Sequence, residues 1–140
     1  MADERKIAIP ESVQFHPDVH LMIFRHRGIL DEESINQIVG FVEQEEIRAD
    51  RPFNRFADLS QLDAVELDFS FIFRISLYRR LAYGNRAPVK SAFYVTSPAT
   101  ARIVRIHALM TDHSPLRVAM FHDVGEAAKW LEVPREFLER

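Results

Sequence analysis

Hydrophobic and polar positions along the chain follow two alternating periods. Short runs that alternate every second residue, typical of strands, are separated by segments in which apolar residues recur every three or four positions, typical of helices. The run at Val19–His26 has apolar residues on both faces, which indicates a central strand covered on both sides. The runs predict five strands, at Lys6–Pro10, Val19–His26, Phe53–Leu59, Val89–Val95 and Leu116–Phe121.

The helical segments begin and end at recognisable signals. Asp31, Ser97 and Asp123 are capping residues placed immediately before helical periodicity, and Pro98 stands at a first helical position. Gly84 follows a densely apolar segment and is a natural helix stop. We expect Ser60–Leu67 to be a polar connection. The helices are predicted at about 31–48, 68–83, 97–112 and 123–131, with a short turn beyond Pro134.

The resulting order is β-β-α-β-α-β-α-β-α. Strands separated by helices imply parallel crossovers, and the first two strands can pair antiparallel at one edge. We therefore predict an α/β fold with a mixed five-stranded sheet and about four helices. A length of 140 residues fits one domain spanning 1–140.

Composition places the chain among ordinary globular proteins. Hydrophobic residues make up 47% and charged residues 28% of the sequence. There is no cysteine, which excludes disulfides and thiolate chemistry and fits a reducing compartment. The first residues contain no apolar signal core, and no long uncharged apolar run follows. We expect a cytoplasmic protein without an integral membrane segment.

The charge is small overall but unevenly distributed. The net charge of −3 does not point to nucleic acid as a partner. Residues 1–70 sum to −8, whereas residues 71–140 sum to +5. Either the helices of the two halves are solvated differently, or a dipolar surface orients a partner or a second copy of the chain.

Catalytic and metal-binding patterns are weak. Zinc needs three or four converging ligands, and the six histidines are dispersed along a chain without cysteine. No G-x-S-x-G nucleophile elbow or glycine-rich phosphate loop is present, and there are four glycines in all. We expect no catalytic residues, no metal and no cofactor.

The segment from Asp68 to Tyr83 is apolar around most of its circumference, which is unusual for a helix that faces only a sheet. One interpretation is that it is buried between the sheet and other helices, and a second is that it forms a dimer interface. Phe69, Phe73 and Tyr78 are alternatively the wall of a pocket for an apolar ligand. A fourth interpretation is contact with a membrane surface through nearby arginines, namely Arg74, Arg79 and Arg80.

Three stretches resemble the STAS-like fold of the SpoIIAA-like anti-sigma-factor antagonists, which is related in architecture to CRAL-TRIO lipid-binding domains. The likeness in element order covers about residues 5–131. It implies a regulatory module that works by protein contact, or by analogy a lipid carrier. The stretches that carry it are Phe56–Ser60, Ser91–Val95, and Val118–Phe121 followed by Glu126–Leu131.

In the antagonist family, a serine at the start of the helix after the third strand is phosphorylated, within an Asp-Ser-Ser-Gly pattern. This chain has Phe69 directly after Asp68, and Ser70 aligns with the second serine of the pattern. The resemblance makes Ser70, or Ser60, a candidate for phosphorylation. The alternative is that Ser60 is a turn residue and Ser70 belongs to the first turn of a helix.

Together these observations predict a regulatory or protein-interaction module without catalytic activity, which forms a homodimer. The expected partner-binding surface contains Asp58, Ser60, Asp68 and Ser70 and continues along the aromatic helix. The alternative is a small carrier or sensor of a lipid or other apolar molecule. A cavity lined by Phe69, Phe73 and Tyr78 would favour the carrier.

Overall fold

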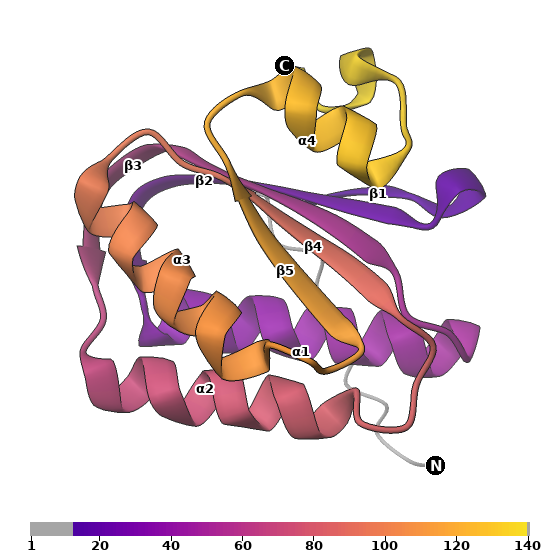
Figure 1. The fold of residues 1–140 in the computed structure, drawn as a ribbon, viewed down its shortest axis with the longest axis horizontal. Coiled ribbons are helices and arrows are strands. Elements are labelled where there is room, and N and C mark those ends of the chain that lie inside the picture. Colours follow the sequence, from indigo (N-terminus) through magenta and orange to yellow (C-terminus); the bar gives the residue numbers. More distant parts are fainter. Residues whose placement is uncertain (1–12, 140) are drawn as a thin grey trace, which may run out of the picture.

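The computed structural model describes residues 13–139 (Figure 1). It contains the predicted alternation of strands and helices, with two short 3-10 turns, η1 (Pro17–Val19) and η2 (Arg135–Phe137). The strands are β1 (Val13–His16), β2 (Leu21–Asp31), β3 (Asn54–Glu66), β4 (Val89–Tyr94) and β5 (Leu116–Phe121), and the helices are α1 (Glu32–Ala49), α2 (Phe69–Ala82), α3 (Pro98–Thr111) and α4 (Val124–Leu131).

The five strands form one mixed sheet in the order β1-β2-β3-β4-β5. The edge strand β1 pairs antiparallel with β2, and the remaining neighbours pair in parallel. This confirms the predicted fold class and element order. The predicted strand at Lys6–Pro10 lies outside the described residues, and β1 at Val13–His16 was not predicted.

The prediction that Ser60–Leu67 is a polar connection is wrong, because β3 continues through Glu66. Its outer half pairs with the outer half of β2, as far as Asp31 opposite Glu66. Strand β2 also continues past Gly28, where the pairing register shifts and φ is +76°. Gln61, Asp63 and Glu66 are exposed in this outer half. Polar residues can occupy a strand here because the paired extension is solvated.

Helices α1, α2 and α3 cover one face of the sheet, and α4 covers the other (Figure 1). On the three-helix face, Phe24 and Ala57 of the sheet pack with Phe41 of α1 and Val104 of α3. The opposite core contains Leu21, Ile23, Phe56 and Ala92 of the sheet together with Ala127, Ala128, Leu131 and Leu138. Alternate residues of β2 and β3 therefore face different helices, as the period of a strand requires.

Side-chain caps start all four helices. The carboxylates of Asp31, Asp68 and Asp123 each accept a hydrogen bond from a backbone N–H in the following turn, and Ser97 does the same through its hydroxyl. Asp68 accepts from Phe71 N at 2.8 Å. These caps fix where α1 to α4 begin and therefore which residues each helix turns toward the sheet.

Candidate functional site

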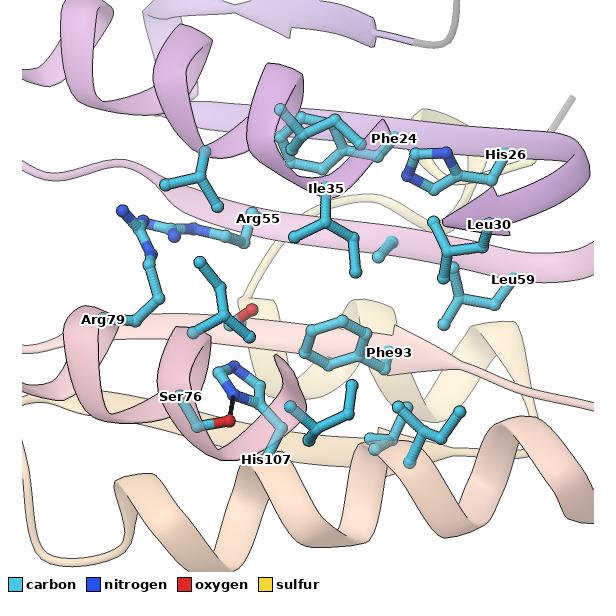
Figure 2. Close-up of a pocket in the computed structure, with 18 of the residues that line it drawn as sticks. Phe24, His26, Leu30, Ile35, Arg55, Leu59, Ser76, Arg79, Phe93 and His107 are labelled. Carbon is cyan, nitrogen blue, oxygen red and sulfur yellow. Dashed lines mark hydrogen bonds between the residues drawn. The ribbon is translucent and has the colours of Figure 1, made fainter. Parts of the chain in front are cut away.

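A cavity of about 150 Å³ lies between the three-helix face of the sheet and helices α1, α2 and α3 (Figure 2). Its walls are predominantly apolar. The lining side chains come from β2 (Phe24, His26, Leu30), α1 (Ile35, Ile38, Val39, Val42), β3 (Arg55, Ala57, Leu59), Leu67, α2 (Ile72, Ile75, Ser76, Arg79), β4 (Ser91, Phe93), α3 (Ile103, Val104, His107) and β5 (Leu116).

Ser76 and His107 form a polar pair in the wall of this cavity. The Ser76 hydroxyl lies 2.9 Å from Nδ1 of His107 and so joins α2 to α3. The His107 and Phe93 rings pack edge to face, with the ring centres 5.8 Å apart. Burial, followed by the positive charges of Arg79 and Arg55, lowers the pKa of His107 to about 4. His107 is therefore neutral at pH 7.

A buried network of charged groups lies next to this pair. Nη2 of Arg55 is 3.0 Å from Oε2 of Glu46 and donates to the Tyr83 hydroxyl at 2.7 Å. The hydroxyl of Tyr83 donates in turn to Oε1 of Glu46. Nη2 of Arg79 donates to the same Tyr83 oxygen at 2.8 Å. The network ties α1, β3 and α2 together inside the core.

The charged and polar side chains are unevenly distributed along the cavity (Figure 2). The guanidinium groups of Arg55 and Arg79 lie at one end, and His26 lies with Leu30 at the other. Burial lowers the pKa of His26, while the Asp58 carboxylate opposes that shift. At neutral pH, the positive charge of the cavity wall is therefore concentrated at the arginine end.

The structure does not bring the four predicted partner-binding residues onto one surface. Asp58 and Ser60 alternate along β3 with Ala57 and Leu59, which line the cavity, so they face the α4 side of the sheet. Oδ1 of Asp58 accepts hydrogen bonds from the backbone N–H of Ser60 at 2.9 Å and from its hydroxyl at 2.6 Å. Asp58 also pairs with Arg25 at 3.5 Å.

The other two predicted residues lie beyond the sheet, at the beginning of α2. Asp68 is the helix cap, and Ser70 is exposed in the first helical turn. A long extended segment of β3 separates this helix start from Asp58 and Ser60. The continuous loop-and-helix surface expected from the sequence is therefore wrong, because its supposed loop is a strand.

Phe69, Phe73 and Tyr78 do not line the cavity, so the pocket wall proposed for them is wrong. These three side chains are exposed on the outer side of α2, as are Leu77 and Leu81. The helix is apolar on two sides because it buries Phe71 and Ile72 inward and presents a second apolar stripe outward. The expected basic patch is also incomplete, since Arg79 is buried.

The sequence did not predict Ser76, Arg79 and His107 as cavity residues. A signal for the first two was available, because Ser76, Arg79 and Tyr83 follow Ile72 at spacings of three or four residues and so share its buried helix face. Polar residues on an apolar helix face are informative when they are buried. His107 had no comparable signal, because its partner Ser76 is 31 residues away in the sequence.

Neither a metal-binding cluster nor a membrane-spanning helix is found among the described residues. Within residues 13–139, no three His, Asp or Glu side chains are grouped so as to hold a metal ion. None of the helices in that range combines the length and hydrophobicity needed to cross a bilayer.

Comparisons with known proteins support the fold. Neither protein-family models nor curated protein sequences gave a match to this chain. Among solved structures, the chain resembles an uncharacterised protein of the DUF3478 family, with a SpoIIAA-like fold, from Shewanella loihica PV-4. The TM-score is 0.56 at 19% identity, over 85% of this chain and 90% of the other. The five-stranded mixed sheet with its four helices is thus a SpoIIAA-like fold.

Proposed function

We propose that this domain binds a small apolar molecule in the cavity between its sheet and helices α1 to α3, and acts as a non-catalytic sensor or carrier of that molecule. The cavity itself carries the proposal. At about 150 Å³ with mostly apolar walls, it has the size of engineered protein cavities that bind benzene.

The energetic cost of the cavity supports a ligand. Protein interiors are close-packed and contain few voids larger than a water molecule. The side chains that line an unfilled space lack van der Waals partners on that side. An apolar occupant would restore the missing contacts, so occupancy would stabilise the fold.

The Ser76–His107 pair does not require a catalytic interpretation. A serine next to a histidine has the composition of a nucleophile and its base. However, a histidine whose pKa is lowered to about 4 is a weak base for a hydroxyl group at neutral pH. We therefore assign the pair to the positioning of α2 against α3 and to the polar lining of the cavity.

Benzene binding tests the proposal. It is monitored through the thermal midpoint of unfolding and through changes in ¹H–¹⁵N NMR chemical shifts. We expect a concentration-dependent rise in the midpoint, with shifts concentrated at cavity residues. Ala57→Leu, which places a larger side chain in the cavity wall, should abolish both effects. Ala99→Leu adds the same atoms at an exposed position of α3 and should bind as the native chain does. Absence of binding to the native chain contradicts the proposal.

A second candidate function is protein interaction through the outer stripe of α2. Phe69, Phe73, Leu77 and Leu81 recur every fourth residue and are between 48% and 71% exposed. This spacing aligns them on one helix face. Contiguous exposed apolar side chains are typical of protein–protein contact surfaces, and a second copy of the chain would cover them in a homodimer.

Sedimentation equilibrium over a range of concentrations tests this second candidate. We expect the native chain to dimerise and the double variant Phe73→Ser, Leu77→Ser to be monomeric while remaining folded. The matched control, Leu109→Ser, changes an exposed leucine of α3 and should leave the dimer unchanged. A monomeric native chain would contradict the homodimer, and the stripe would then have to be covered by a different protein partner.

A further inference from the structure

We propose that the ligand is a small carboxylic acid, with its carboxylate bound by Arg79 and its apolar body in the cavity. This inference rests on the proposed function and names the chemical class of the ligand. It follows from the charges, the unused donor and the shape of the cavity.

The buried charges next to the cavity do not balance. Arg55, Arg79 and Glu46 are all at least nine-tenths buried, so two guanidinium groups face one fully buried carboxylate. Arg55 is engaged through Nε and Nη2, with hydrogen bonds to Glu46, to the Tyr83 hydroxyl and to the carbonyl of Phe53. Arg79 lines the cavity, and the carboxylate that it pairs with, Glu43, is only partly buried.

Arg79 has a donor to spare. Its Nη2 donates to Tyr83, whereas its buried Nη1 has no hydrogen-bond acceptor among residues 13–139. The nearest opposite charge is Oε2 of Glu43, at 3.7 Å, and that oxygen already accepts the Tyr78 hydroxyl at 2.6 Å. A buried cation with an unused N–H is costly unless something binds to it, and a carboxylate is the oxygen acceptor that guanidinium groups bind best.

The cavity has one charged end and one apolar region (Figure 2). Arg79 lies at one end of the cavity, and the Ser76–His107 pair lies nearby. Phe93 and Leu59 line the space farther from the arginines. A molecule that satisfies both regions has one anionic group and one apolar body.

The volume limits that body to about six carbon atoms, because cavities of about 150 Å³ accommodate benzene. Benzoate is a suitable probe of this class. Nitrobenzene is the matched neutral compound, since a nitro group has the planar shape of a carboxylate without its net charge. Any difference between the two affinities then reports the charge of the site.

Isothermal titration of the native chain with both compounds tests the inference. We expect benzoate to bind at least about tenfold more tightly than nitrobenzene, which corresponds to one charged hydrogen bond. Equal or weaker binding of benzoate, with nitrobenzene still bound, overturns the inference and leaves the proposed function standing. If neither compound binds, both proposals fail. This comparison requires no variant.

The variant Arg79→Met is a second test, since it removes the charge while keeping an unbranched side chain. We expect it to reduce benzoate affinity by about tenfold to hundredfold and to leave nitrobenzene affinity within about threefold. Arg74→Met removes the same charge from the exposed side of α2 and should change neither affinity. Equal losses for both compounds in Arg79→Met would mean that Arg79 only shapes the cavity.

Discussion

The hydroxyl of Tyr83 donates a hydrogen bond to Glu46, and this contact joins the end of α2 to α1 across 37 positions of the sequence. The same oxygen accepts hydrogen bonds from Arg55 and Arg79. One phenol group thus occupies the centre of the buried charges beside the cavity. Burial raises the pKa of Tyr83, although the two arginines oppose that shift, so the hydroxyl keeps its proton and its role as a donor.

We predict that Tyr83→Phe destabilises the fold by about 3 kcal/mol, because it leaves three buried charged groups each without one hydrogen-bond partner. Urea denaturation measures the loss as a lower midpoint with an unchanged slope. Tyr78→Phe is the control: it also removes a hydroxyl bonded to a glutamate, but at the surface. Its effect should stay within about 0.5 kcal/mol. Similar losses in the two variants would contradict the central role of Tyr83.

The stability of the domain should fall as the pH decreases from about 6.5 to about 4. His107 binds a proton near pH 6.5 when unfolded but only near pH 4 when folded, so acid in this window favours the unfolded chain. The shift corresponds to about 3 kcal/mol, and its contribution levels off below about pH 4. His26 acts in the same direction, since its folded pKa is also lowered.

Urea denaturation at several pH values measures this dependence. His107→Gln should flatten the pH profile between about 4 and 6.5 without removing it, because His26 remains. His113→Gln changes an exposed histidine and should leave the profile unchanged. A native-like slope in His107→Gln would show that other groups produce the acid sensitivity.

Asp68 is expected to act on the start of α2. Its carboxylate accepts the backbone N–H of Phe71, so Asp68→Ala should cost about 1 kcal/mol in the free energy of unfolding. Asp63→Ala removes an exposed carboxylate from β3 and should change stability by less than about 0.5 kcal/mol. Equal effects would indicate that the charge, rather than the cap, matters at this position.

The sequence predicted the elements whose signals are local. Asp31, Ser97 and Asp123 stand directly before the helices they cap, and the apolar runs of β4 and β5 match the observed strands within one residue. A cap or a short apolar run depends on residues only a few positions apart. These features therefore determine local structure before any long-range contact forms.

The outer half of β3 could not be predicted in the same way. Its residues from Ser60 to Glu66 are largely polar, and they are held in a strand by pairing with β2, more than thirty positions earlier. The cavity presents the same difficulty on a larger scale. Its walls come from seven helices and strands and from Leu67 between β3 and α2, and a void exists only where the side chains of all of them fail to fill the space.

Phe69, Phe73 and Tyr78 of α2 lie on the side of the helix that faces away from the cavity, so they do not form a pocket wall, while the dimer surface stays a prediction. Phe69 and Phe73 were predicted as a possible pocket wall because they are large and apolar, yet they face outward. The residues that line the cavity include Ser76 and Arg79, which are polar and lie among apolar neighbours. Burial of a polar group has to be compensated by partners, so such residues indicate a site more reliably than aromatic residues do.

Gly28 permits the irregular pairing that lets β2 and β3 continue beyond the rest of the sheet. Its φ of +76° lies in the left-handed region, and the register shifts between Gly28 and Ile29. We predict that Gly28→Ala lowers stability by about 1–2 kcal/mol, although open space surrounds the added methyl group, because the cost arises from the backbone alone. Gly84→Ala is the control, since Gly84 does not have a positive φ and its added methyl group would meet only an ordinary contact. Hydrogen exchange should show faster opening of residues 28–31 and 62–66 in Gly28→Ala, and unchanged exchange there would mean that the extension does not depend on this glycine.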